Sequence, residues 1–270
     1  MLIGGSMLVN ANEILRDGKV IQFNINNLEW TKWILEECNR LHKNVILGVS
    51  SNAIKYMGGP NVVALMVKGL LMDLDIRIKV CLHLDHGKDI NICKKCIDAG
   101  FTSVMFDGSL MELDENIRIT KEVKEYASLF NVTVEGEVGV IGGELPSISL
   151  VKRYVDETSV DMVAVALGTV HGYGHMDIDW SLLDEVQKEI DVPLVLHGGS
   201  GISNDVLRLF VDKGISKINI NTDLQSAFSK AIRNFLETNS DVYDPRKIIG
   251  FGEEALKKEV SSKLNVLDGR

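Results

Sequence analysis

Short apolar runs rich in β-branched residues recur along the whole chain, and a segment with helical spacing follows each of them. The runs are Val20–Phe23, Val45–Ser50, Val80–Asp85, Ser103–Asp107, Val132–Val138, Met162–Gly168, Pro193–His197 and Ser216–Asn221. The helical segments begin near Leu28, Asn61, Asp89, Asp114, Ser147, Ser181, Ser203 and Asp223. Strands that alternate with helices predict parallel pairing through right-handed crossovers.

Eight such units in a chain of 270 residues predict an α/β fold, a single-domain (β/α)8 TIM barrel. The alternative is a doubly wound open sheet, which usually has fewer strands and carries a glycine-rich dinucleotide fingerprint after its first strand. The segment Asn24–Asn27 follows the first strand here and contains no glycine.

No shift in composition marks a domain boundary, so we treat residues 1–270 as one barrel. Met1–Ser6 has the character of an extension or tag remnant. Residues 243–270 are expected to form a helical tail that packs on the outside of the barrel or on another subunit.

Polar side chains interrupt the apolar pattern near the carboxyl ends of several predicted strands. Residues i and i+2 of a strand share a face, which gives the sets His83–Asp85, Ser103–Met105–Asp107, Glu135–Glu137 and Lys217–Asn219–Asn221. The apolar residues between them must pack under the helices, so the polar sets point into the barrel. Buried charges are costly unless they are paired or bind a metal. The pattern therefore predicts a site at the carboxyl end of the barrel, where active sites of this fold lie.

Three of the six histidines stand at or just past the ends of separate strands: His86, His171 and His197. Three converging imidazoles with open positions for a substrate form a ligand set suited to Zn²⁺. Of the others, we expect His42 and His175 to be solvated and His83 to orient Asp85.

Glycine-rich and helix-opening segments follow the last two strands. They are His197-Gly198-Gly199-Ser200-Gly201 and Asn219-Ile220-Asn221-Thr222-Asp223. Glycine lets backbone N–H groups approach an anion, and a helix N-terminus adds partial positive charge. Tight turns and a helix cap would give the same local pattern. Beside the histidines, however, it indicates the phosphate site that barrels often build from these two loops.

The net charge of −9, without a long basic run, argues against nucleic acid as a partner. The sequence has no apolar run long enough to cross a membrane and no basic-then-apolar leader, and we expect a cytoplasmic protein. Cys93 and Cys96 form a CxxC. We interpret them as neighbours on a helix rather than half a zinc site or a redox pair, because no second CxxC completes a four-thiolate set.

Together these residues resemble the class II, zinc-dependent fructose-bisphosphate aldolases over nearly the whole chain. The matching blocks are FNINNLEW (Phe23–Trp30), HLDHG (His83–Gly87), DAGFTSVMFDGS (Asp98–Ser109), VEGEVGVIGGE (Val134–Glu144), ALGTVHG (Ala166–Gly172), PLVLHGGSGI (Pro193–Ile202), KININTDLQ (Lys217–Gln225) and YDPRK (Tyr243–Lys247). Their order and spacing are specific.

The resemblance implies a role for each matching residue. His86, His171 and His197 would bind a catalytic zinc ion, and Asp85 would be the acid/base at the bond being broken. Substrate and phosphate contacts would fall on Asn24, Ser50, Gly172, Gly198, Gly199, Ser200, Asn219, Asn221 and Thr222. Asp107 and Glu137 match positions that hold a second divalent or a monovalent cation in such enzymes. They could equally hydrogen-bond the histidine ligands.

The expected reaction is the reversible cleavage of fructose 1,6-bisphosphate to dihydroxyacetone phosphate and glyceraldehyde 3-phosphate, a step of glycolysis and gluconeogenesis. Cleavage leaves negative charge on the ketone half, which zinc would stabilise as a Lewis acid. A lysine Schiff base could do the same, but Lys217 stands at the end of its strand far from the predicted metal. One alternative is a tagatose-1,6-bisphosphate aldolase, against which Asn221 weighs slightly. Another is a non-catalytic sugar-phosphate sensor, which the retained histidines and Asp85 oppose.

Two segments are shorter than the resemblance leads us to expect. Gly142-Gly143-Glu144 runs into Leu145-Pro146, where relatives carry a second acidic residue and a long mobile loop. Tyr173-Gly174-His175 stands where they commonly carry a phosphate-contacting lysine. Either the deletions are real and weaken or redirect the enzyme, or the sequence omits residues of mobile loops. We favour the second interpretation, because lids over barrel sites are often mobile. The resemblance also implies a homodimer or homotetramer.

Overall fold

A computed structural model describes residues 7–268, and Met1–Ser6 lies outside them. Eight parallel strands close into a barrel in chain order, with the first strand paired to the last. The strands are β1 Val20–Asn24, β2 Val45–Ser50, β3 Val80–Gly87, β4 Ser103–Phe106, β5 Thr133–Val138, β6 Met162–Val165, β7 Leu194–Leu196 and β8 Ile215–Ile220. The structure confirms the predicted TIM barrel.

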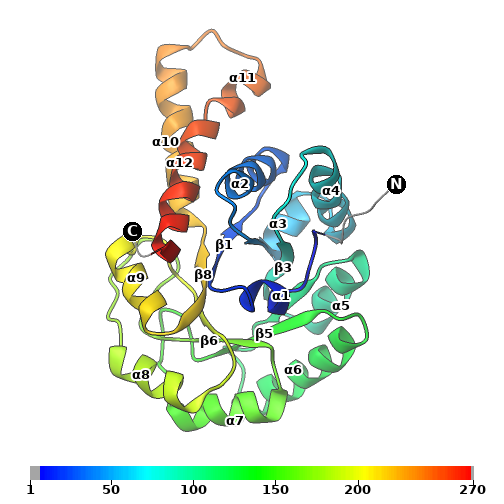
Figure 1. Ribbon diagram of the computed structural model, residues 1–270, viewed down its shortest axis with the longest axis vertical. Coiled ribbons are helices and arrows are strands. Elements are labelled where there is room, and N and C mark those ends of the chain that lie inside the picture. Colours follow the sequence, from blue (N-terminus) through cyan, green and yellow to red (C-terminus); the bar gives the residue numbers. More distant parts are fainter. Residues whose placement is uncertain (1–6, 269–270) are drawn as a thin grey trace.

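A ring of helices surrounds the barrel (Figure 1), and each predicted helix begins within one residue of its expected start. These helices are α2 Leu28–Arg40, α4 Pro60–Asp73, α5 Ile90–Ala99, α6 Leu113–Ser128, α7 Ile148–Thr158, α8 Trp180–Glu189, α9 Asn204–Asp212 and α10 Thr222–Thr238. Several starts are fixed by caps, since the side chains of Asn27, Asp89, Asp179 and Ser203 accept hydrogen bonds from first-turn N–H groups.

The last helices form an arm beside the barrel. Helices α11 (Pro245–Gly250) and α12 (Glu253–Leu264) and the 3₁₀ turn η1 (Asn265–Asp268) follow α10. Figure 1 shows α10 and α12 running side by side and projecting past the ring, with α11 near the tip of the projection. Helix α12 also packs against α2, so the tail lies on the outside of the barrel, as predicted.

A short helix that the sequence pattern did not reveal, α1 (Ala11–Leu15), lies across the amino end of the barrel (Figure 1). Its buried residues Ala11 and Ile14 join an apolar cluster inside the barrel with Val20, Ile46, Cys81, Met162, Ala164 and Val195. A second short helix, α3 (Ser51–Tyr56), follows β2 directly and is capped by the side chain of Ser50.

The barrel interior therefore changes character along its axis. The amino end is filled by the apolar cluster and closed by α1, whereas the buried side chains above it are polar, among them Gln22, His83, Glu135 and Lys217. The apolar residues between them, such as Leu82 and Leu84, pack in the separate core beneath the helices. This division leaves the carboxyl end as the place for chemistry.

Among residues 7–268, no helix combines the length and the apolar character that crossing a bilayer requires. All four cysteines are buried and free, and Cys93 and Cys96 are neighbours on α5 within the hydrophobic core. This placement agrees with the interpretation of the CxxC as two neighbours on a helix.

The closure by α1 predicts a large effect of a single substitution far from the site. Ile14 is 1% exposed, so Ile14→Ala should lower the free energy of unfolding by about 2–5 kcal/mol through lost burial and the cavity left behind. Urea denaturation measures this. The exposed neighbour Arg16 provides the control, and Arg16→Ala should change stability by less than about 0.5 kcal/mol. Equal effects of both substitutions would contradict the role given to α1.

Candidate metal and phosphate site

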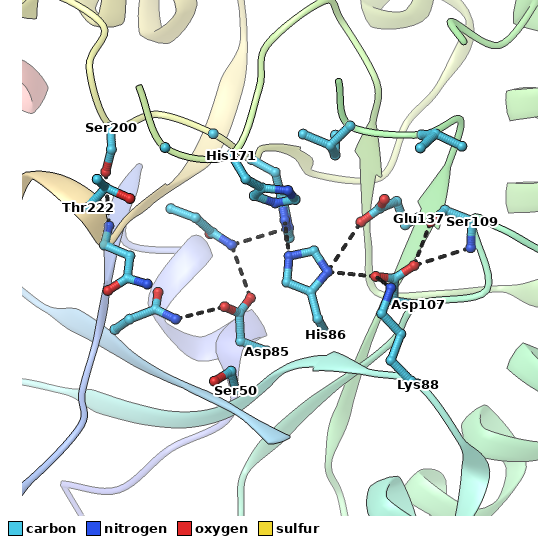
Figure 2. A pocket seen from close by; sticks show the side chains of 18 of the residues that line it. Ser50, Asp85, His86, Lys88, Asp107, Ser109, Glu137, His171, Ser200 and Thr222 are labelled. Carbon is cyan, nitrogen blue, oxygen red and sulfur yellow. Dashed lines mark hydrogen bonds and ion pairs between the residues drawn. The ribbon is translucent and has the colours of Figure 1, made fainter. Parts of the chain in front are cut away.

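A cavity of about 450 Å³ opens at the carboxyl end of the barrel. Every site residue predicted from the sequence except Gly199 lines it. Lys88, Ser109, Leu110, Val140 and Ile141 line it as well and were not predicted. Figure 2 shows His86 near the centre, with Asp85 on one side, Asp107 and Glu137 on the other, and Ser200 and Thr222 at the far edge.

An irregular strand end brings two consecutive residues into this cavity. Successive side chains of a regular strand point to opposite faces, yet both Asp85 and His86 line the cavity. The pairing of β3 with β4 shifts register between Leu84 and Gly87, and His86 adopts a left-handed backbone with φ 51°. Such a conformation is costly for a residue other than glycine and persists where the surroundings enforce it, often at functional sites.

The three predicted histidines converge. One ring nitrogen from each of His86, His171 and His197 lies within 4.8 Å of the others. His86 Nε2 and His197 Nδ1 are 3.0 Å apart. His171 belongs to the loop after β6, and the side chain of Thr169 ties that loop to β7 by donating to the carbonyl of His197 at 2.8 Å.

Carboxylates hold the outer nitrogens of two of these rings. His86 Nδ1 lies 2.7 Å from Asp107 Oδ2, and His197 Nε2 lies 2.7 Å from Glu135 Oε1. A carboxylate only accepts hydrogen bonds, so the ring nitrogen facing it carries the proton. The inner nitrogens, His86 Nε2 and His197 Nδ1, then turn lone pairs toward each other.

Two lone pairs 3.0 Å apart require a positive ion between or beside them. Nitrogens bound to one tetrahedral zinc at ~2.0–2.1 Å stand roughly 3.3 Å apart, close to this spacing. A proton can take the same place. Burial lowers the pKa of His86, but Asp85, Asp107 and Glu137 outweigh burial and raise it to about 9. The donor set thus fits a divalent cation, held by the three histidines.

Two asparagines fix the carboxylate of Asp85 beside the histidines. Asn24 Nδ2 donates to Asp85 Oδ2 at 2.8 Å, and Asn219 Nδ2 donates to Oδ1 at 3.3 Å. Burial raises the pKa of Asp85, but the charges of His86, His197 and Lys217 outweigh burial and hold it well below its usual range. Asp85 therefore presents an ionised and oriented carboxylate to the cavity. The prediction that His83 orients it was wrong, because His83 Nδ1 pairs instead with Ser103 Oγ at 2.8 Å.

Asp107 and Glu137 form a second group with His86 that could hold a metal. Asp107 already accepts from His86, from Lys88 at 2.5 Å and from Ser109, which matches the alternative that it orients a histidine. Glu137 differs: its Oε2 is buried without a hydrogen-bond partner, and burial raises its pKa.

The N-terminus of α10 forms the other edge of the cavity. The side chain of Asn221, at the cap position, makes no capping hydrogen bond. Ser200 Oγ accepts from the N–H groups of Asn221 and Asp223 at 3.1 and 3.3 Å, which leaves its hydroxyl proton for a ligand. A helix N-terminus next to small residues and hydroxyl groups suits an anion such as phosphate.

Two glycines in the preceding loop have different tasks. Gly198 has φ 68°, and a Cβ there would stand 2.2 Å from the carbonyl oxygen of Val170, so only glycine fits beside the cavity. Gly199 faces β8, and its N–H donates to the carbonyl of Asn219 at 3.2 Å. Because this N–H already donates within the protein, it does not face the cavity as a donor to a phosphate, which was the role predicted for Gly199.

The positions of two histidines and of one buried ion pair can be compared with the sequence predictions. His42 and His175 are exposed, as expected, and belong to neither histidine group that could hold a metal within residues 7–268. Sequence reasoning missed the role of Glu135 and underestimated Lys217, whose ammonium group lies 2.7 Å from Glu135 Oε2. Alternation had already placed both residues on inward faces, and only the reach of the lysine side chain was overlooked.

Backbone hydrogen bonds close both short loops. The β5–α7 loop closes on itself, since Val140 N donates to Glu144 O and Gly143 N donates to Val140 O. The β6–α8 loop closes where Asp177 N donates to the carbonyl of Gly168. Both segments therefore form closed loops with the residues of this sequence, and neither extends over the cavity as a long lid.

Comparison with known proteins shows the family to which this chain belongs. Residues 8–270 match the family described as "Fructose-bisphosphate aldolase class-II". The chain belongs to this family. A fructose-bisphosphate aldolase from Geobacillus stearothermophilus is 45% identical over 276 aligned positions, covering 96% of this chain and 95% of the relative. The alignment is longer than this chain of 270 residues, as expected if the relative has longer loops.

Two further relatives of this class II aldolase bear on substrate and fold. A 6-phospho-5-dehydro-2-deoxy-D-gluconate aldolase from Bacillus subtilis is 41% identical, covering 95% of this chain and 94% of the relative. The crystal structure of the YdjI aldolase from Escherichia coli superposes with a TM-score of 0.85 at 24% identity, covering 96% of this chain and 97% of the other. The protein is thus a carbon–carbon lyase of a metal-dependent family with a TIM-barrel fold.

The proton shared by the histidines predicts how metal binding depends on pH. Below pH about 9 the metal-free protein carries this proton on His86, and a metal must displace it. Zinc affinity should therefore rise with pH toward 9, by up to about tenfold per unit. Isothermal titration in buffers of different ionisation enthalpy would show proton release at pH 7. The control His175→Ala should release the same number of protons on zinc binding as the unaltered protein. Zinc binding without proton release would contradict the assignment of a proton to His86.

Proposed function

We propose that the protein is a zinc-dependent aldolase that reversibly cleaves fructose 1,6-bisphosphate to dihydroxyacetone phosphate and glyceraldehyde 3-phosphate. The observation that carries the proposal is the convergence of three histidine nitrogens within 4.8 Å, beside the carboxylate of Asp85. The similarity to aldolases of that name over almost the whole chain supports the same substrate.

Asp85 performs the proton transfer in this proposal. Its ionised carboxylate, held by Asn24 and Asn219, takes the proton from the hydroxyl whose carbon becomes the aldehyde. In the reverse direction Asp85 returns that proton to the newly formed alkoxide. His86, His171 and His197 would hold the zinc ion, which would supply a Lewis acid for the negative charge left on the ketone half.

The phosphate of the ketone half binds at the N-terminus of α10 in this proposal. Gly172, Gly198, Ser200 and Thr222 line that edge of the cavity, and the positive end of the helix dipole faces it. Asn24 and Ser50 line the cavity at the ends of the neighbouring strands β1 and β2, and they contact the remainder of the sugar in this proposal. Gly199 is left out of this set, since its N–H is used within the protein.

Several finer assignments stay predictions. A second divalent or a monovalent cation would bind at Asp107 and Glu137, where one buried oxygen lacks a partner. Assembly as a homodimer or homotetramer is proposed from the family resemblance. Action in the cytoplasm without nucleic-acid or membrane partners is proposed from the net charge and the apolar pattern of the sequence.

Replacing the acid/base separates catalysis from metal binding. Asp85→Ala should lower the turnover of fructose 1,6-bisphosphate by at least about 10²–10⁴-fold, because the proton has no other positioned acceptor. The variant should still bind one zinc ion through its three histidines. Coupled-enzyme assays and metal analysis measure the two quantities. Full turnover by this variant would show that the acid/base assignment is wrong.

A second candidate substrate comes from the relatives. The Bacillus subtilis enzyme is named for a six-carbon sugar acid phosphate and is nearly as similar as the fructose-bisphosphate aldolases. Side-by-side cleavage of that compound, fructose 1,6-bisphosphate and tagatose 1,6-bisphosphate with added zinc is the direct comparison. We expect the highest kcat/KM with fructose 1,6-bisphosphate and loss of activity on chelation. A higher value with either other sugar would replace the proposed substrate.

The same assay tests the non-catalytic alternative. The short loops after β5 and β6 favour a sugar-phosphate sensor, and the intact histidines and Asp85 oppose it. A sensor would bind all three compounds without turnover at any zinc concentration, and that result would overturn the proposal of an enzyme.

A further inference from the structure

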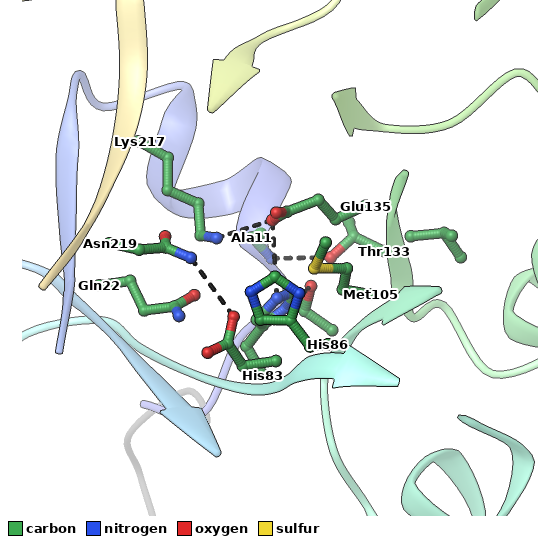
Figure 3. Close-up of polar contacts among 12 residues, drawn as sticks. Ala11, Gln22, His83, His86, Met105, Thr133, Glu135, Lys217 and Asn219 are labelled. Atoms are coloured by element: carbon green, nitrogen blue, oxygen red, sulfur yellow. Dashed lines mark hydrogen bonds and ion pairs between the residues drawn. The ribbon is translucent and has the colours of Figure 1, made fainter. Parts of the chain in front are cut away.

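A buried ion pair crosses the inside of the barrel directly beneath the histidines. Lys217 Nζ on β8 lies 2.7 Å from Glu135 Oε2 on β5, and both side chains are completely buried. Strands β5 and β8 are not neighbours in the barrel, so the pair spans its interior (Figure 3). Burying two charges costs desolvation free energy. This cost points to a function of the pair that an apolar contact could not perform.

The second oxygen of Glu135 reaches the histidine cluster. Glu135 Oε1 lies 2.7 Å from His197 Nε2, and His197 is itself only 1% exposed. Because a carboxylate can only accept, this contact places the proton of the neutral ring on Nε2. The lone pair of His197 is thereby placed on Nδ1, the nitrogen that lies 3.0 Å from His86 Nε2.

Lys217 fixes the direction of the Glu135 carboxylate. Its ammonium group lies 2.7 Å from Oε2, and this contact leaves Oε1 facing His197 Nε2. Without the ammonium, Glu135 would be a buried charge with one oxygen unpaired, and its carboxylate could turn away from His197. His197 would then lose the acceptor that sets its ring orientation.

The other groups around Glu135 do not substitute for this contact. His83 Nε2 lies 3.6 Å from Glu135 Oε2, and burial lowers the pKa of His83 to about 3, so it stays neutral. The NH₂ group of Asn219 lies 3.2 Å from His197 Nε2, but this group can only donate, and it has Asp85 Oδ1 as its acceptor. Among the described residues, Glu135 is thus the acceptor that orients His197.

We propose that Lys217 and Glu135 are positioning residues, a relay that fixes the ring of His197 with Nδ1 toward the metal. The proposal rests on the proposed function only in taking the three histidines as metal ligands. It assigns to Lys217 a purpose other than Schiff-base formation: its amine is fully buried and ion-paired, and it acts through Glu135 and His197 without meeting the substrate. Partners of this kind typically change metal affinity by about 10–100-fold.

Glu135→Gln tests the relay because it keeps the shape and removes one acceptor. The introduced amide has two possible orientations. If its oxygen accepts from His197, its NH₂ group faces the ammonium of Lys217. If its oxygen accepts from Lys217, its NH₂ group faces the proton on His197 Nε2. One contact is broken in either orientation. The dissociation constant for zinc, measured against a competing chelator, should rise about 10–100-fold. The visible spectrum of the Co²⁺-substituted protein should change as well.

A second substitution should restore what the first removes. In the double variant Glu135→Gln, Lys217→Met, no ammonium competes for the amide oxygen, which can turn to His197. Zinc affinity should then recover by at least about fivefold relative to Glu135→Gln alone, whereas Lys217→Met alone should weaken binding. A merely structural role would make the two effects add.

Glu37→Gln is the matched control. Glu37 on α2 is a buried carboxylate that pairs with Arg40 and accepts from Ser261, away from the cavity. This variant should lose stability and keep zinc affinity within about twofold. Normal zinc binding by folded Glu135→Gln, or no recovery in the double variant, would overturn the relay. Failure of the unaltered protein to bind zinc would instead overturn the metal site of the proposed function.

Nitrogen-15 NMR of the unaltered, zinc-loaded protein gives a test that survives if the variants do not fold. The relay predicts that His197 carries its proton on Nε2 and binds the metal through Nδ1. A proton on Nδ1, or metal on Nε2, would contradict it whatever the variants do.

Discussion

Charge buried inside a closed barrel is the constraint on which the rest of the structure depends. Asp85, Asp107, Glu135 and Glu137 are each at most 6% exposed, and none can stay ionised without partners. Asparagines hold Asp85, Lys217 holds Glu135, and His86 with Lys88 holds Asp107. Glu137 has one oxygen without such a partner. Two lysines do not balance the other three carboxylates, so the histidine cluster is a place where added positive charge is stabilised.

The side chains inside the barrel are arranged in layers along its axis, and each layer differs in polarity. The amino end is sealed by α1 over an apolar cluster, which keeps water away from the middle of the barrel. The middle layer holds the Lys217–Glu135 pair, and its second oxygen sets the orientation of His197 above it. The cavity of about 450 Å³ at the carboxyl end then brings together the carboxylate of Asp85, the three converging histidines and the N-terminus of α10. Each layer depends on the one below.

Much of this followed from the sequence because alternation and helical spacing are local signals. The eight strands, the helix starts and the inward faces of Asp85, Glu137 and Asn219 needed no tertiary information. What failed depended on geometry beyond the strand. Helix α1 is too short to show a period, the shift near His86 breaks alternation, and the partner of His83 lies on β4. The long side chain of Lys217 also acts well above its own position in the strand.

The central claim is that three imidazoles from separate parts of the chain share one metal ion. X-ray absorption at the zinc edge of the loaded protein tests this most directly, because it reports the type and distance of the ligands. The account predicts one zinc ion per chain with three imidazole nitrogens at about 2.0–2.1 Å and no sulfur. Fewer than three imidazoles, or a thiolate ligand, would contradict it.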